Sequence, residues 1–182
     1  MTATHRTVYG AFTDREHAQH ALDDLRTHGF GREDMSFVDS ARDEDVNLVR
    51  RMDTRSEEGT GYGIAAGGTI GAILGALAGL GAGIIAIPGL GGLLVAGWLL
   101  AALSGLSIGG AVGGIVGALV GHGIPEDEAI AAEQYLRQGK PIVVVRAGNR
   151  VDEALKVLAA HNALNVPPAA MGAGGATEKP AA

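Results

Sequence analysis

The chain has 182 residues, a formal net charge of -6 at pH 7 and no cysteine. An acidic chain without a cluster of lysine and arginine lacks the basic face that nucleic-acid binding requires, so we expect no nucleic-acid partner. The absence of cysteine excludes a disulfide framework and thiolate chemistry.

The pattern of residues 1–40 predicts a β-α-β unit, which would be the first half of an α/β domain. The segment Thr7–Phe12 is rich in strand-forming residues and predicts a first strand. Thr13 opens a capping-box pattern, and apolar residues at helical spacing follow it, so a helix is expected. This helix should end at Gly29, in the left-handed cap position. A second strand is predicted over Met35–Val38.

The next segment, residues 41–58, is charged and only weakly periodic. Such a pattern is typical of a linker rather than of a packed element. We therefore predict a charged linker here, with one short helix around Glu44–Met52.

The following segment, residues 59–123, contains no Asp, Glu, Lys or Arg. Two apolar stretches, Tyr62–Ile87 and Leu90–Gly121, lie on either side of a Pro-Gly pair. Each is longer than the roughly 20 residues that cross a hydrocarbon core. The segment therefore predicts a transmembrane helical hairpin, whose second helix has a candidate break near Ser104.

Glycine recurs at every fourth residue in both apolar stretches. Because residues four apart lie on one face of a helix, a glycine stripe lets a second backbone approach closely. We interpret the two ladders as a glycine zipper that also joins copies of the chain. The candidate helix-packing residues are Gly63, Gly67, Gly71, Gly75, Gly79, Gly83, Gly105, Gly109, Gly113, Gly117 and Gly121.

The segment 124–166 predicts the second half of the α/β domain. Pro125 and the acidic residues after it are typical of a helix start. The β-branched run Ile142–Val145 predicts a central strand that is buried on both faces. Asn149 is a candidate cap for the next helix, and Leu164–Val166 predicts a short edge strand. The remaining residues, 167–182, are rich in glycine, alanine and proline and predict a disordered tail.

The order of these elements predicts an α+β fold, a ferredoxin-like split βαβ domain interrupted by the transmembrane hairpin. If the two halves form one domain, both ends of the hairpin lie on the same side of the membrane. Basic residues near the two ends, such as Arg50, Arg51 and Arg137, place that side in the cytoplasm. The hairpin is thus expected in a membrane that borders the cytoplasm, with both termini cytoplasmic.

The sequence contains no motif for catalysis, for a cofactor or for a metal ion, so we expect none of these and no enzymatic activity. His17 and His20 lie one helical turn apart near Asp24, which a surface metal site could use. We favour a solvated helix face there. His122 lies at the predicted membrane edge, where we favour a plain interfacial residue over a pH sensor.

The segments TVYGAF, DREHAQHALDDLRTHGF and MSFV resemble the domain of bacterial general stress (heat-induced stress) proteins. The later segments IPEDEAIAAEQYLRQGK and PIVVVRA complete a resemblance to membrane-inserted variants with a glycine-rich hydrophobic insertion. The resemblance covers residues 5–166. It implies a bacterial source, and hence the bacterial inner membrane as the location of the hairpin. It also implies a role in stress, and it implies no catalytic residue.

Together these patterns predict a non-enzymatic, stress-associated integral membrane protein that forms a homo-oligomer through its glycine-zipper helices. Its partner would be the lipid bilayer, and its cytoplasmic domain would serve interaction or sensing, with an unknown small-molecule ligand. One alternative is a pore-forming or membrane-remodelling oligomer. Another is a soluble oligomer that buries the hairpin in its own centre.

Overall fold

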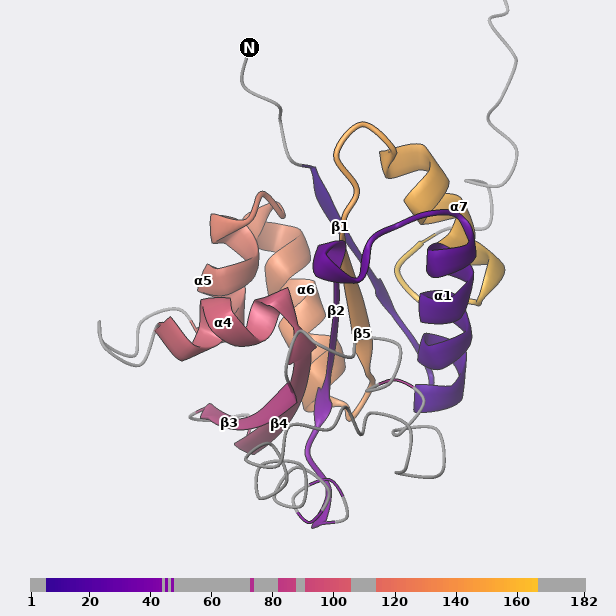
Figure 1. The fold of residues 1–182 in the computed structure, drawn as a ribbon. Coiled ribbons are helices and arrows are strands. Elements are labelled where there is room, and N and C mark those ends of the chain that lie inside the picture. The colour runs from indigo at the N-terminus through magenta and orange to yellow at the C-terminus, as the bar shows by residue number, and fades with distance from the viewer. Residues whose placement is uncertain are drawn as a thin grey trace, which may run out of the picture.

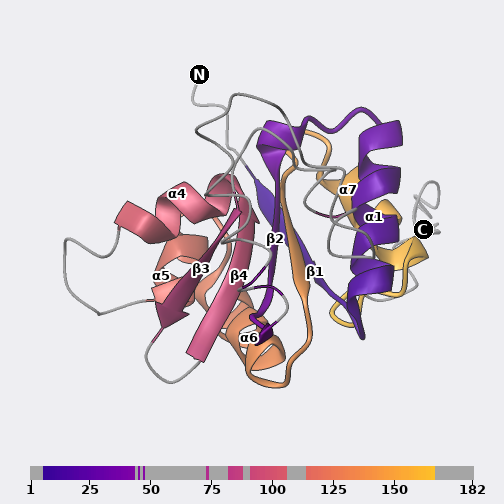
Figure 2. The ribbon, with the colours of Figure 1, turned by 60° about the horizontal axis from the view of Figure 1, so that its bottom comes forward.

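The computed structural model describes residues 6–43, 45, 47, 73, 82–87, 91–105 and 114–166. These residues form a mixed α+β fold around one five-stranded sheet, with helices on both faces (Figures 1 and 2). The strand order is β1-β5-β2-β4-β3, and every neighbouring pair is antiparallel. The α+β class expected from the sequence is therefore confirmed.

The first β-α-β unit consists of β1 (Thr7–Ala11), α1 (Arg15–Thr27) and β2 (Met35–Ser40), with a short 3-10 turn, η1 (Arg32–Asp34), before β2. The helix start differs by one residue from the prediction. Asp14, not Thr13, is the N-cap, and its carboxylate accepts a hydrogen bond from the His17 backbone N at 3.0 Å. Gly29 has a φ of +78°, the left-handed conformation that its position predicted.

The strand β5 (Ile142–Arg146) lies between β1 and β2 and is antiparallel to both. Its residues Ile142–Val145 are fully buried, and their side chains alternate between the two faces of the sheet. An unbroken apolar run is what a strand covered on both faces needs, because neither face meets water. The predicted central strand is thus confirmed.

Two further helices frame β5. Helix α6 (Glu126–Arg137) begins directly after Pro125, with three acidic residues in its first turn, as predicted. Helix α7 (Val151–Ala160) begins after Arg150, and its start has no side-chain cap hydrogen bond among the described residues. The predicted Asn149 cap is therefore wrong.

The sheet separates two hydrophobic cores. Helices α1 and α7 cover one face. The other face is covered by α6 together with α4 (Trp98–Gly105) and α5 (Gly114–Gly121) (Figure 2). Fully buried large side chains, each contributing roughly 1.5–3 kcal/mol, fill both cores. The first core includes Phe12, Leu22, Leu25, Phe37, Val143 and Leu158, and the second includes Val38, Leu99, Ile115, Leu119, Ile142 and Val144.

The described part of the apolar middle is not a helical hairpin. Its residues form β3 (Ala82–Ile87), β4 (Gly91–Gly97) and two eight-residue helices, α4 (Trp98–Gly105) and α5 (Gly114–Gly121). β4 pairs with β2 and extends the sheet, and α4 and α5 pack over it (Figure 1). A charge-free apolar run is compatible with a strand covered on both faces, so hydropathy alone could not distinguish it from a membrane span.

Among the described residues, no helix has the length and apolar character needed to cross a bilayer. The predicted integral membrane protein is therefore wrong, and so are the transmembrane hairpin and the inner-membrane location. The pore-forming and membrane-remodelling alternative needed the same spanning helices and loses its basis with them. The alternative in which protein, rather than lipid, buries the apolar segment fits better, because the described part of that segment is buried in the two cores of the chain.

Three smaller predictions concern the linker, the last predicted strand and the tail. Asp43, Asp45 and Asn47 are helical, at the start of the short helix expected in the linker. Leu164–Val166 is a turn rather than a strand. The predicted disordered tail, residues 167–182, lies outside the described part of the chain.

Candidate functional site

The outer edge of β1 is covered by the turn that follows α7. The side-chain carbonyl of Asn165 accepts a hydrogen bond from the Ala11 backbone N at 2.8 Å, and its amide donates to the Tyr9 carbonyl at 3.0 Å. The backbone N of Leu164 donates to the Ala11 carbonyl at 2.7 Å. The turn thus makes the hydrogen bonds to β1 that a neighbouring strand would make, although the turn itself is not a strand.

The opposite edge of the sheet is β3, which is uncharged and apolar. Its residues pair with β4 without a bulge, from Ala82 opposite Ala96 to Ile87 opposite Gly91. On the outer side of β3, no backbone hydrogen bond joins it to another described residue. Proteins usually protect an edge strand with charge, proline or a bulge, and β3 has none of these.

Both faces of β3 are partly covered by its own chain. A Cβ added at Gly83 would lie 3.1 Å from Leu100 Cδ1, so α4 sits closely over this position. Ile85 packs against the core on the α4 side, and Ala82 and Ile84 pack against the core on the α1 side. Among the described residues, the backbone edge is therefore the part of β3 that is not covered.

The predicted helix-packing glycines lie in three different elements or outside the described residues. Gly83 belongs to β3, Gly105 ends α4, and Gly117 and Gly121 belong to α5. At Gly117 and Gly121 an added Cβ would meet no described atom within 4 Å. Their packing role stays a prediction, as does that of the glycines outside the described residues: Gly63, Gly67, Gly71, Gly75, Gly79, Gly109 and Gly113.

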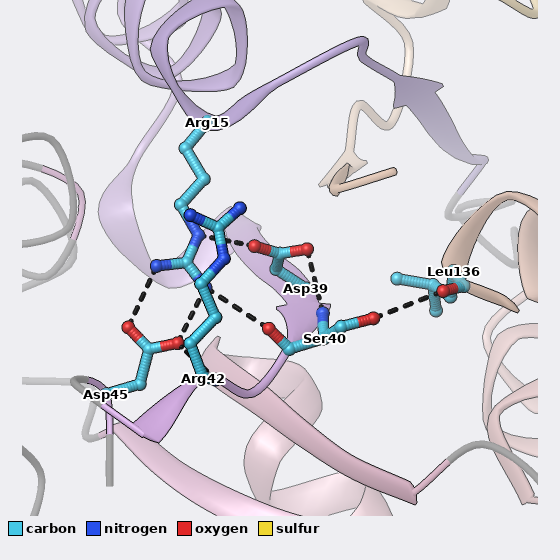
Figure 3. A network of polar contacts seen from close by, with 6 residues as sticks. All are labelled: Arg15, Asp39, Ser40, Arg42, Asp45 and Leu136. Atoms are coloured by element: carbon cyan, nitrogen blue, oxygen red, sulfur yellow. Dashed lines mark hydrogen bonds and ion pairs between the residues drawn. The ribbon is translucent and has the colours of Figure 1, made fainter. Parts of the chain in front are cut away.

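A buried charge cluster joins the start of α1 to the end of β2 (Figure 3). Arg15, only 6% exposed, donates through Nη1 and Nη2 to the Asp45 carboxylate at 2.8 and 2.6 Å, and through Nε to Asp39. Burial opposes the charge of Arg15, but the hydrogen bonds to Asp45 and Asp39 outweigh it and raise the pKa of the guanidinium.

The cluster fixes the chain where β2 leaves the sheet. The Asp39 carboxylate also accepts from the Ser40 backbone N at 2.7 Å, and the Ser40 hydroxyl donates to the Leu136 carbonyl at 3.2 Å (Figure 3). One residue later, the Ala41 backbone N donates to the Gly92 carbonyl at the start of β4. We assign the cluster a structural role, holding the β3–β4 side of the sheet onto α1.

The histidines singled out in the sequence are not brought together as a metal pair. The His17 ring lies 2.8 Å from an Asp14 oxygen, and Asp24 instead meets His161 of α7's C-terminal end at 3.0 Å. This hydrogen bond lowers the pKa of the Asp24 carboxyl. The described residues contain no group of three or more metal-ligating side chains. His122 lies in the connection between α5 and α6, and its predicted place at a membrane edge is lost together with the membrane span.

Sequence reasoning missed the edge strand, although two signals were present. The Pro88-Gly89 pair between two apolar runs is a common turn signal, and Ile84 and Ile85 are β-branched. The apolar stretches on both sides of this turn are long enough to span a membrane, and that length favoured helices over strands.

Neither a protein-family model, nor a curated protein, nor a solved structure matches this chain. The resemblance to general stress proteins therefore stays a prediction.

Proposed function

We propose that this protein is a non-enzymatic, self-associating protein in which β3 of one copy pairs with β3 of a second copy. The observation that carries the proposal is the uncharged edge of β3, which is hydrogen-bonded on one side only among the described residues. Strands of this kind are templates for pairing with another chain.

The pairing is self-complementary if the two strands run antiparallel about a two-fold axis perpendicular to the sheet. This rotation maps each face of the sheet onto itself. Directly opposite residues of two antiparallel strands point their side chains to the same face, so a residue of β3 can lie opposite only those residues of the copy that point to that face. The centre of the pairing is then either Ile84 opposite Ile84 of the second copy, or Ile85 opposite Ile85 of the second copy. The five strands of each chain would join into one continuous ten-stranded sheet.

The expected driving force is the pairing of backbone groups in an apolar setting. Two six-residue strands exchange on the order of six hydrogen bonds, each worth about 0.5–1.5 kcal/mol. The apolar side chains of β3 would meet those of its copy on both faces and add burial. No charge on β3 opposes the approach of a second copy.

The first test compares two lysine substitutions by analytical ultracentrifugation of the full chain. Ala86 is exposed on β3, and Ile130, which is 44% exposed on α6, is the matched control. We expect the wild type and Ile130→Lys to be dimers and Ala86→Lys to be a monomer, because lysine on an edge strand disfavours pairing. A wild type that is monomeric at every concentration would overturn the proposal.

A second test uses the lack of cysteine in the chain. Opposite residues in an antiparallel pair lie about 4.5–5.5 Å apart between Cα atoms, within reach of a disulfide. A single cysteine at position 84 or at position 85 should give a covalent dimer under mild oxidation, whereas Ala101→Cys, on the exposed side of α4, should not. Cross-linking by the α4 variant alone would point to a different interface, and association without cross-linking at either β3 position would exclude this pairing.

The non-enzymatic role and the link to stress belong to the same proposal. The buried charges of Arg15, Asp39 and Asp45 pair with one another, which supports a structural role for them. The link to stress has its support in the resemblance of the N-terminal segments. An expression profile that does not respond to heat, acid or osmotic shock would argue against that link and leave the β3 pairing untouched.

We also propose that the core is ferredoxin-like. The arrangement that supports this is the pair β1 and β2, joined by α1, with β5 inserted antiparallel between them and followed by α7 on the α1 side. The turn at Leu164–Val166 takes the place of the fourth strand beside β1. An experimental structure with α1 and α7 on opposite faces would contradict this assignment.

A further inference from the structure

A hollow with a volume of about 550 Å³ opens at the end of the sheet where β1 and β5 meet the connection between α5 and α6. This volume lies in the range of pockets that hold small molecules. Segments far apart in the sequence contribute its walls, which are fixed to one another. The Thr7 hydroxyl, for example, donates to the His122 carbonyl at 2.6 Å across 115 positions of the sequence. The lining residues are Thr7, Asp34, Gly121, His122, Gly123 and Arg146.

Trp98, the first residue of α4, contacts two of the side chains that line this hollow, His122 and Arg146. The His122 ring lies with its centroid 4.6 Å from that of Trp98, and the Arg146 guanidinium lies 4.9 Å from the Trp98 ring. These contacts hold an imidazole and a guanidinium against the same indole. Trp98 is also the single tryptophan of the chain.

Two N–H donors in this group are buried and have no hydrogen-bond acceptor among the described residues: Trp98 Nε1 and Arg146 Nε. Arg146 Nε lies 3.5 Å from an Asp34 oxygen, which is close enough for an ion pair but does not meet hydrogen-bond geometry. Buried donors are normally satisfied, so Arg146 Nε, on a side chain that lines the hollow, lacks the acceptor that a ligand could supply. The Nδ1 of His122 donates to the Ala118 carbonyl at 2.7 Å, which fixes the ring beside Trp98.

The ion pair between Arg146 and Asp34 is of a kind that a ligand can replace. Their side chains are 33% and 41% exposed, and pairs so open to water contribute little. Arg146 also donates to the Glu33 carbonyl, which holds its position when Asp34 turns away. An incoming oxyanion would take the place of the Asp34 carboxylate and accept hydrogen bonds from a guanidinium already in position.

From this geometry we infer that the hollow binds a small molecule through an oxyanion, a carboxylate or a phosphate group, held by Arg146 next to His122, with Trp98 in contact with both side chains. Asp34 competes with the ligand for Arg146. The inference is independent of the β3 pairing, because none of these residues lies in β3.

The fluorescence of Trp98 makes the inference directly measurable. Inorganic phosphate, acetate and citrate are titrated separately into the full chain at constant ionic strength, with chloride as the control anion. We expect a saturable change with phosphate or with a carboxylate, and none with chloride. The comparison of phosphate with the two carboxylates identifies which oxyanion the hollow prefers.

Three variants separate this site from general charge effects. Arg146→Gln should weaken binding at least about tenfold, because a charge-assisted hydrogen bond is lost. Asp34→Asn should strengthen it about two- to fivefold, because the competing carboxylate is removed. Arg150→Gln, on another exposed arginine paired with Glu153, should leave binding unchanged.

The opposite directions expected for Asp34→Asn and Arg146→Gln keep the test decisive even if one variant fails to fold. No saturable change with any of the three anions in both the wild type and Asp34→Asn would overturn the inference. So would a saturable change that a folded Arg146→Gln protein retains in full.

Discussion

The two edge strands of the sheet, β1 and β3, differ in how their outward backbone groups are covered. At β1, a polar side chain and a turn satisfy the outward backbone groups, and the sheet ends there. At β3, an uncharged strand presents its backbone without such a cover among the described residues. The fold itself closes the sheet at β1, and on our proposal a second copy of the chain completes it at β3.

The largest expected effect comes from removing the cation that holds the β3 side of the sheet to α1. Arg15→Met leaves the buried carboxylates of Asp39 and Asp45 without their partner, and breaking a buried pair costs about 3–5 kcal/mol. Urea unfolding should show this loss. Arg26→Met, which removes an exposed pair with Asp23 at 3.5 Å, should change the free energy of unfolding by less than about 1 kcal/mol. Equal losses in the two variants would contradict the structural role of the cluster.

The junction between β4 and α4 tests which glycines the fold requires. Gly97 has a φ of +93°, and a Cβ there would lie 2.4 Å from the Met35 carbonyl oxygen. Gly97→Ala should therefore cost at least about 2 kcal/mol, since both the strained backbone and the contact must relax. Gly117→Ala, in an open helical position, should stabilise the protein by about 0.5–1 kcal/mol. Thermal unfolding of the two variants measures the contrast, and destabilisation by Gly117→Ala would restore a packing role for that glycine.

Asn165→Ala should uncover the β1 edge and make the two edges alike. The change removes two hydrogen bonds to β1 and leaves their backbone partners unsatisfied, at a cost of about 1–3 kcal/mol. With an open strand at both ends of the sheet, association should extend beyond a dimer. Light scattering against concentration measures this, and Leu164→Ala, which keeps the backbone hydrogen bond to Ala11, is the control in the same turn. A variant that remains a dimer would show that Asn165 supports the turn without guarding the edge.

The parts of this fold that could be predicted from the sequence are those with local signals. The amphipathic repeat of α1, the acidic start of α6 and the β-branched run of β5 each specify their element without reference to the rest of the chain. The apolar middle has no polar face to set a period. Whether it becomes helix or strand depends on β2, with which β4 pairs. The edges and the hollow depend on contacts such as that of Asn165 with Tyr9, 156 positions apart, which no local pattern contains.

The smallest expected effect is acid loosening of the cover over β1. His161, at the end of α7, is bonded to Asp24 of α1 just before the turn that carries Asn165. Because the hydrogen bond from His161 lowers the pKa of Asp24 below its ordinary value of 3.8, the stabilisation is present above that value and is lost as pH falls through the lowered pKa. Asp24 is partly exposed, so the effect on the free energy of unfolding is small.

Hydrogen exchange can detect that loosening where bulk unfolding cannot. Below pH 4, exchange at the Leu164 amide, which bonds to Ala11, should accelerate relative to amides of β5 after correction for intrinsic rates. Asp24→Asn should show the faster relative exchange already at neutral pH and lose its dependence on acid. If Leu164 stays as protected as β5 in acid and in Asp24→Asn, the turn holds the β1 edge through Asn165 and the Leu164 amide without help from the pair of Asp24 and His161.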